Sequence, residues 1–208
     1  MSKRNNIGSA RTLQASGGSA LKVRFLQTDE HQAVCEFMVD YRQAAVPERF
    51  YSADYCDVQR ARSGFGLLFG KLIIGTSKLR TKIEIDFPQD MFVRQLWASS
   101  KDFYKTVQTI ADKMHLPPVT DLEETDKVQT FRANNVFMGV WGEEGVIDFY
   151  YISPRDMHFA QFQQRGDAGL EPVIRVLMSA ALLFEFLEKC RHQIESFPEI
   201  QVSPMEVR

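Results

Sequence analysis

The cysteine and histidine side chains are the first places to look for chemistry in this sequence. The chain has three cysteines and four histidines, at Cys35, Cys56, Cys190, His31, His115, His158 and His192. No two of them have the CxxC or CxxxH spacing with which a zinc site begins. Cys190 and His192 stand two positions apart on an expected helix, so they point to different faces and do not form a nucleophile–base pair. The cysteines are therefore expected to be small buried apolar residues.

Three carboxylates gather around one expected hairpin, at Glu143, Glu144 and Asp148. Such a group could supply a general acid and a general base, but carboxylates in a turn are more often solvated. The sequence has no GxxxxGK[ST] phosphate loop, no GxSxG elbow and no HExxH metal motif. We therefore expect no catalytic residue, no metal and no cofactor, and a protein that is not an enzyme.

A basic hairpin gives the sharpest local signal. Residues 58–83 contain six basic residues and no acidic one. Residues 60–69 (RARSGFGLLF) partly resemble the RNP1 strand of RNA-recognition domains, in which aromatic side chains on a sheet stack on bases. The pattern departs from that strand at Leu67 and Gly70, where aromatic residues would stand. The candidate contacts to a nucleic acid are Arg60, Arg62, Phe65, Phe69, Lys71, Lys78, Arg80 and Lys82. The alternative is that both phenylalanines pack in the core of a hairpin with basic edges.

Two further segments could contact a protein partner. The last expected helix carries an apolar stripe wider than one core contact requires, which favours a partner on its second side. The segment 158–162 (HFAQF) could clamp a partner with its two aromatic residues, or those residues could anchor the loop. The candidate interface residues are Phe159, Phe162, Leu182 and Phe186.

Composition is ordinary for a globular protein, but charge is unevenly placed. Of 208 residues, 44% are hydrophobic and 25% are charged. Residues 1–82 carry a net charge of +6 and residues 83–208 a net charge of −8, which together give −2. Such a chain could attract an anionic partner to its first part or pair with a copy of itself. No signal peptide or membrane-spanning run is visible, so we expect a cytoplasmic protein with no membrane partner.

Hydrophobic periodicity predicts the elements. Alternating or short apolar runs predict strands over 21–27, 56–62, 67–74, 82–87, 91–97, 127–131, 136–141, 146–152 and 172–178. Helical spacing predicts helices over 29–45 and 99–114, and a helix after Ser179. Tight turns are expected at residues 63–66 and 142–145, where glycines allow positive φ. The expected fold class is α+β, with antiparallel meanders and helices packed on one face, arranged as two related halves.

The expected domain organisation follows from composition. Residues 1–20 form a disordered basic tail, 21–116 a first α+β unit, 117–126 an acidic linker and 127–208 a second α+β unit. The two units align in part. Residues 93–97 followed by a helix match residues 174–178 at an offset of 81, and 58–68 can be laid on 136–146 at an offset of 78. An alternative alignment pairs 82–87 with 146–151.

Residues 134–136, 146–149 and 173–179 carry a resemblance to a small bacterial domain family of uncharacterised function. That family is known as a hairpin, a strand and a C-terminal helix, so the resemblance implies this arrangement for about 65 residues of the second unit. The order of strands followed by a helix also resembles the SecB-type export chaperones. Neither resemblance implies a catalytic residue.

These observations leave surfaces as the expected means of action. We expect an interaction or assembly protein that acts through protein–protein surfaces and forms homo-oligomers. The alternative is a nucleic-acid-binding protein that uses the basic hairpin 58–83 and the N-terminal tail.

Overall fold

A computed structural model gives the fold of the chain. It describes residues 21–27, 33–39, 42, 44–61, 64–73, 78–92, 101–114, 128–156 and 170–196. Within these ranges, the side chains of residues 21–39, 79–81, 90–91 and 101–102 are not described. The predicted tail at 1–20 and the predicted linker at 117–126 lie outside the described residues.

The chain divides into two compact units, which differ from the two predicted halves. One unit, Met1–Ala45 with Ile152–Glu171, contains strands β1 (Leu21–Gln27) and β2 (Ala33–Val39), which pair antiparallel over seven residues each. The strand predicted at 21–27 is confirmed. The helix predicted over 29–45 is wrong because seven of its residues form β2. A short apolar run fits both periods, and pairing with β1 satisfies the backbone of residues 33–39.

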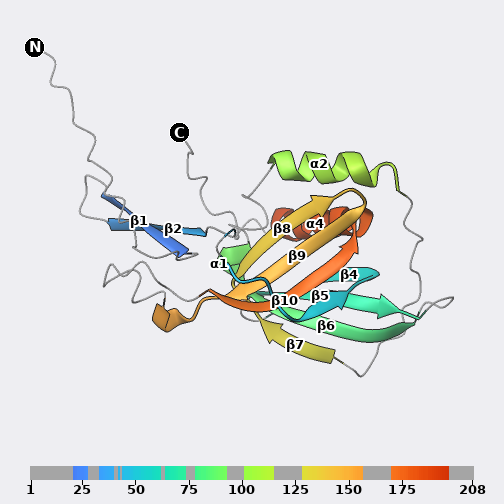
Figure 1. Ribbon diagram of the computed structural model, residues 1–208, viewed down its shortest axis with the longest axis horizontal. Helices are drawn as coiled ribbons and strands as arrows, with labels where there is room; N and C mark the ends of the chain where they lie inside the picture. Colours follow the sequence, from blue (N-terminus) through green and yellow to red (C-terminus); the bar gives the residue numbers. More distant parts are fainter. Residues whose placement is uncertain are drawn as a thin grey trace, which may run out of the picture. The chain divides into compact units, whose positions relative to one another are not determined.

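The other unit contains the remaining described elements, arranged around two mixed sheets (Figure 1). These elements are β3 (Phe50–Ser52), β4 (Tyr55–Ala61), β5 (Gly64–Leu72), β6 (Leu79–Pro88), α1 (Gln89–Phe92), α2 (Lys101–Ala111), β7 (Val128–Arg132), β8 (Asn135–Trp141), β9 (Glu144–Tyr151), β10 (Glu171–Ser179) and α4 (Ala180–Glu195). The first sheet has the strand order β4-β5-β6-β7, and the second sheet has the order β3-β10-β9-β8. The fold class is therefore α+β.

The inner faces of the two sheets meet in one hydrophobic core. Phe69 of β5 lies 6.0 Å from Phe149 of β9 between ring centroids, and Phe87 of β6 lies 6.4 Å from the same ring. Phe186 of α4 closes this cluster at 5.3 Å from Phe69. Phe65 stacks on Phe92 of α1 at 4.0 Å. All six rings are fully buried, and their apolar burial stabilises the packing of the sheets and helices.

Each sheet receives its fourth strand from another part of the chain. In the first sheet, β4, β5 and β6 pair antiparallel in sequence order, while β7 pairs parallel with β6. In the second sheet, β8 and β9 pair antiparallel, while β3 pairs parallel with β10. The strand predicted over 127–131 is confirmed as β7, whereas β3 was not predicted and neither parallel pairing was part of the predicted antiparallel meanders. They are non-local pairings, which periodicity along the chain does not reveal.

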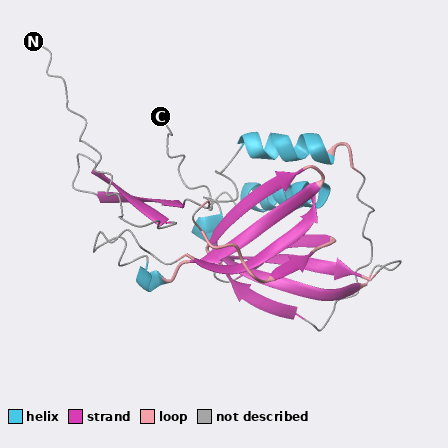
Figure 2. Ribbon diagram, viewed as in Figure 1, coloured by secondary structure: helices cyan, strands magenta, loops and turns pink. Residues whose placement is uncertain are grey.

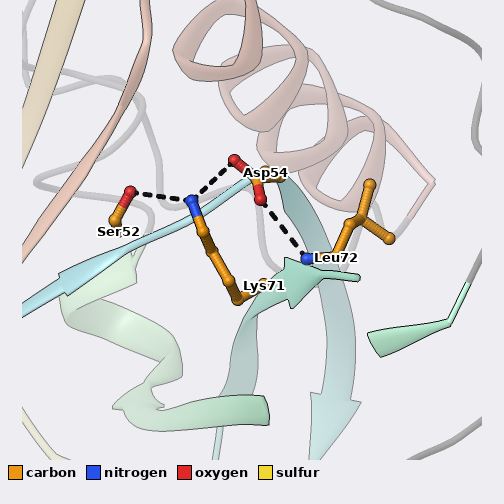
Figure 3. Close-up of polar contacts among 4 residues, drawn as sticks. All are labelled: Ser52, Asp54, Lys71 and Leu72. Carbon is orange, nitrogen blue, oxygen red and sulfur yellow. Dashed lines mark hydrogen bonds and ion pairs between the residues drawn. The ribbon is translucent and has the colours of Figure 1, made fainter. Parts of the chain in front are cut away.

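The chain passes from the second sheet to the first at a corner between β3 and β4. The N–H of Ala53 donates to Leu177 O of β10 at 2.8 Å, and the next N–H, of Asp54, donates to Gly70 O of β5 at 2.9 Å. Lys71 ties the corner from β5, since its Nζ donates to Ser52 Oγ at 3.2 Å and to Asp54 Oδ1 at 3.0 Å (Figure 3). Leu72 N–H donates to Asp54 Oδ2 in the same cluster.

An equivalent corner lies between β7 and β8, where the chain passes from the first sheet to the second. The N–H of Ala133 donates to Asp86 O of β6 in the first sheet at 3.1 Å, and that of Asn134 donates to Tyr150 O of β9 in the second sheet at 3.0 Å. Ala53 and Ala133 are both buried and belong to the hydrophobic core. The two sheets therefore exchange edge strands through corners 80 residues apart.

Helix α4 covers the edge of the first sheet (Figure 2). Ser179 caps the helix as predicted, and its Oγ accepts from Leu182 N–H at 3.1 Å. From α4, Lys189 Nζ donates to Cys56 O at 2.6 Å and Gln193 Nε2 donates to Val58 O at 3.1 Å. Both carbonyls belong to β4, the edge strand of the first sheet. The two α4 side chains therefore hydrogen-bond backbone oxygens that would otherwise be open to pairing with another strand. Helix α2 packs on α4, where Tyr104 donates to Glu188.

Two local predictions are corrected by the structure. Met91 and Phe92 lie in α1 rather than in the strand predicted over 91–97, and residues 93–97 lie outside the described residues. Gly64 and Gly66 lie inside β5 rather than in a turn. A Cβ on Gly64 would collide with the backbone carbonyl of Phe87, so close strand approach requires this glycine. The turn predicted at 142–145 is confirmed at Gly142, which has a φ of 58°.

Candidate protein-interaction surface

The two cysteines whose side chains are described are buried, and their thiols are held in the protonated, unreactive form. Cys56 and Cys190 are both free thiols in the core. Burial raises the pKa of the Cys56 thiol to about 12 and raises the pKa of Cys190 well above its ordinary value. A nucleophilic cysteine needs the opposite shift, so neither thiol is an activated nucleophile. Across the described ranges, no group of three His, Cys, Asp or Glu side chains could hold a metal ion.

The three carboxylates singled out in the sequence do not converge. Glu143 and Glu144 are exposed at the turn between β8 and β9. Asp148 is buried and receives two hydrogen bonds from Arg175, from Nε at 2.6 Å and from Nη2 at 2.7 Å. This bidentate pair holds the carboxylate in one orientation. Burial and the charge of Asp148 raise the pKa of neighbouring Tyr150 to about 12, so its phenol stays protonated.

The two aromatic residues of the predicted nucleic-acid site are not available for stacking. Phe65 and Phe69 are fully buried between the sheets. The prediction that they contact a nucleic acid is wrong. The alternative, that both phenylalanines pack in the core, is correct. The period of β5 points alternate residues inward, and its inward positions are Phe65, Leu67 and Phe69, so the aromatic side chains belong to the core.

The basic residues of the same hairpin are dispersed. Arg60 and Lys78 are exposed, while Lys71 makes its ion pair with Asp54 at 3.0 Å. Lys82 shares the outer face of the first sheet with Glu84 and Asp86. Phe65 and Phe69, the aromatic residues predicted to act with these cations, are buried and so give them no platform. Arg62 lies outside the described residues, and so does the side chain of Arg80.

The predicted interface residues on α4 are also corrected. Leu182 and Phe186 are buried against the two sheets, because the wide stripe of this helix fills the core on one side and covers β4 on the other. They are not exposed to a partner. Phe159 and Phe162 lie outside the described residues.

The structure reveals a surface that the sequence reasoning missed, on the outer face of the second sheet. Trp141 is 88% exposed, Phe50 73%, and Phe137 and Leu177 39% each. The first three are all the aromatic side chains that are exposed among the described residues. They alternate with inward residues such as Val136 and Val176, so they share one side of the sheet. We call this surface the aromatic face: Phe50, Phe137, Trp141, Val146, Asp148, Arg175 and Leu177.

One row of side chains crosses the aromatic face from edge to edge. Phe137 on β8 is paired in register with Asp148 on β9, and Phe50 on β3 with Arg175 on β10. The ion pair between Asp148 and Arg175 joins the two halves of the row. Val146 and Phe137 fill the space over Gly139, since a Cβ there would lie 3.2 Å from Val146 Cγ1 and 3.6 Å from Phe137 Cε1. The row therefore reads aromatic, acid, base, aromatic.

The outer face of the first sheet has the same strand pattern and a different chemistry. Its corresponding row, by strand order and register, is Asp57 on β4, Leu68 on β5, Glu84 on β6 and Thr130 on β7. The next row contains Gln59, Asp86 and Arg132, and Arg132 Nε lies 3.6 Å from Asp86 Oδ2. In these two rows Leu68 is the one apolar side chain, and Val128 lies on the same side of β7, but neither row contains an aromatic residue. The fold itself therefore does not require aromatic residues at these positions of an outer face.

A sequence signal for the aromatic face did exist. Residues 135–141 (NVFMGVW) place Phe137 and Trp141 on the same side of a strand, away from Val136, Met138 and Val140. Laying residues 55–61 on 135–141 at an offset of 80 sets Phe137 against Asp57. At an offset of 78, Phe137 falls on Gln59, which is also polar.

Compared with protein-family models, with curated proteins and with solved structures, the chain matches none. In the described part of the chain, no helix combines the length and apolar character needed to cross a bilayer.

Proposed function

We propose that this protein is a non-enzymatic interaction or assembly protein that acts through the aromatic face. The observation that carries the proposal is the exposure of Phe50, Phe137 and Trp141 on one sheet side. Exposed aromatic residues grouped on one surface are typical of protein-binding sites. Large aromatic side chains contribute most to binding when a partner removes them from water.

The polar face of the first sheet supports the proposal as an internal comparison. At corresponding positions that sheet carries Asp57 instead of Phe137, and Thr130 instead of Phe50. If both outer faces only met solvent, similar polar residues would serve on both. The aromatic residues cost solubility without contributing to the core, so a partner that covers them explains their presence.

Charge favours a protein partner over a nucleic acid on this face. An aromatic sheet that stacks bases is normally bordered by lysine and arginine residues that contact phosphates. Here Trp141 is followed closely by Glu143 and Glu144, and the guanidinium of Arg175 is engaged by Asp148. A phosphate backbone would meet acidic side chains at this end of the strands.

A photo-crosslinking amino acid placed at Leu177 tests whether the aromatic face meets a protein. The variant is produced in the cells that make the protein and is irradiated there. We expect a discrete protein adduct from position 177. The matched control places the same group at Asp86, which occupies the corresponding position of the first sheet, and gives no adduct. The proposal is wrong if position 177 gives no adduct, or gives the same adducts as position 86.

We also infer that the two halves of the larger unit are related. In support, β3 and β4 correspond to β7 and β8 at an offset of 80, and so do the corner residues Ala53 and Ala133. The last strand of each half corresponds at an offset of 91, because the connection before β10 is longer than that before β6. In this alignment the first strand of each half, β3 or β7, belongs to the sheet formed by the other three strands of the other half.

A further inference from the structure

We propose that the aromatic face binds an apolar segment of a partner protein that carries an arginine, and that Trp141 and Glu144 together receive its guanidinium. This inference rests on the proposed function and names the chemistry of its partner. It starts from the hairpin of β8 and β9, in which Trp141 and Glu144 are paired in register. Both side chains are exposed, so both are accessible to a partner.

The side chains of Trp141 and Glu144 are neighbours on the aromatic face. Residues directly opposite each other in paired strands point to the same side of a sheet, with Cβ atoms about 5 Å apart. Gly142, with a φ of 58°, lies in the turn between them. Ala180 N–H donates to Glu143 O at 2.7 Å, which holds this turn against the end of β10. The backbone therefore places the indole beside the carboxylate before a partner binds.

Charge on this side of the sheet favours a basic partner. In the described part of the chain, Glu143 and Glu144 make no ion pair. The aromatic face contains one basic residue, Arg175, and Asp148 already accepts two hydrogen bonds from its guanidinium. The free charge beside Trp141 is therefore negative, and a cation of the partner complements it.

Arginine suits this pair of side chains better than lysine. A guanidinium is planar, so it stacks on an indole and also donates two parallel hydrogen bonds to one carboxylate. The ammonium group of lysine is a compact, strongly hydrated charge that cannot make both contacts in this way. The arginine side chain therefore explains why an exposed tryptophan and an exposed glutamate stand opposite each other.

The rest of the partner segment must be apolar, because Phe137, Val146 and Leu177 make up the neighbouring part of the face. Phe137 and Trp141 lie four positions apart on β8, which is about 13 Å along a strand. The partner therefore presents an arginine and an apolar side chain about 13 Å apart, which corresponds to four positions of an extended segment.

The first sheet lacks this pair at the corresponding place. At the offset of 80, Ala61 of β4 corresponds to Trp141, and Gly64 of β5 corresponds to Glu144. Ala61 and Gly64 are themselves paired in register, so the comparison is between equivalent positions of two hairpins. The fold is built there without an indole or a carboxylate, which supports a binding role for the pair in the second sheet.

A cross-linking assay with separately treated components tests the inference. The purified full chain, with a photo-crosslinking amino acid at Leu177, is mixed with an extract of the cells that make the protein and irradiated. Beforehand, one portion of the extract is treated with phenylglyoxal, which modifies arginine, and another with an acetylating reagent, which modifies lysine. We expect the protein adduct to be lost after phenylglyoxal treatment and to remain after acetylation.

Variants of the chain test the same contact from the other side. Glu144→Gln should raise the chain concentration for half-maximal adduct formation by about tenfold, because a charge-assisted hydrogen bond is lost. Trp141→Leu, which keeps an apolar side chain but removes the ring, should have a similar effect. The double variant should be little worse than either single variant, because both residues act on one guanidinium. The matched control, Glu84→Gln on the outer face of the first sheet, should leave the concentration unchanged.

The outcomes separate this inference from the function on which it rests. An adduct that survives phenylglyoxal treatment and forms equally well with Glu144→Gln overturns the arginine contact and leaves the proposed function standing. Loss of the adduct after acetylation alone also overturns the arginine contact, because it identifies a lysine. The absence of any adduct with the untreated extract contradicts the proposed function itself, and this inference with it.

Discussion

The ion pair between Asp148 and Arg175 lies in the middle of the central row of the aromatic face. Its two hydrogen bonds of 2.6 and 2.7 Å orient both groups, and the same bonds raise the pKa of the guanidinium. The pair is half desolvated, since the Asp148 side chain is 3% exposed and that of Arg175 is 31% exposed. Such a pair contributes orientation more than stability, and breaking it from one side is costly.

Asp148→Asn should therefore lower the free energy of unfolding by about 3 kcal/mol, because it leaves the arginine charge without its partner. Urea denaturation at high dilution measures this change. The double variant Asp148→Leu with Arg175→Met should recover most of the loss, since the first sheet carries Leu68 at the position of Asp148. An unchanged unfolding midpoint for Asp148→Asn would contradict this account of the pair.

The buried thiols make a second prediction at the scale of residues. In a Cys35→Ser variant, an aromatic disulfide reagent at pH 8 should modify Cys56 and Cys190 only as fast as the protein unfolds, because both are buried and protonated. The folded pKa of Cys56 is raised, so its stabilising effect is complete below the unfolded value of 9.0 and is lost as pH rises towards about 12. Immediate modification of both thiols in the folded protein would contradict their burial.

At the scale of elements, the strand corners determine how the two sheets are joined. At each corner, consecutive N–H groups donate to carbonyls of different sheets, and a buried alanine stands between them. The ion pair of Lys71 and Asp54 at the first corner is about 40% exposed and so contributes little, about 1 kcal/mol or less. The small size of Ala53 and Ala133 is therefore the more important constraint.

Ala53→Leu and Ala133→Leu should each lower the free energy of unfolding by about 1–3 kcal/mol, because three extra heavy atoms must fit into a packed core. Thermal and urea denaturation give the values. Ala45→Leu is the control, since Ala45 is exposed and a surface change has an effect of about 0.5 kcal/mol or less. Equal stability of the corner variants and the control would mean that the corners tolerate larger residues.

The elements also show how far the sequence could predict this structure. Strands such as β1, β8 and β9 were predicted within a few residues, because their alternation is set by one buried face. The helix predicted over 29–45 failed because a seven-residue apolar run has no unique period. The strand predicted over 127–131 is β7, but its parallel pairing with β6 was not predictable from periodicity, because the two strands lie far apart in the sequence. Strand β3 was missed altogether, because it is only three residues long and its partner β10 is also distant.

The candidate site was predicted poorly for a related reason. Phe65, Phe69, Leu182 and Phe186 were chosen as contact residues by type, but residue type does not say which face of an element is buried. The aromatic face depends on two strand pairings, β8 with β9 and β3 with β10, which place Phe137 and Phe50 on one side of one sheet. The polar residues at the corresponding positions of the first sheet, Asp57 and Thr130, support the proposal that this face binds a partner.

For the whole molecule, the central claim is that the aromatic face is covered by protein where the molecule works. Hydroxyl-radical labelling of Trp141 tests this most directly, with Val128 on the edge strand β7 as the internal control. We predict that Trp141 is labelled several-fold less in the cells that make the protein than in the purified chain at high dilution, while Val128 is labelled equally in both. Equal labelling of Trp141 under the two conditions would contradict the claim.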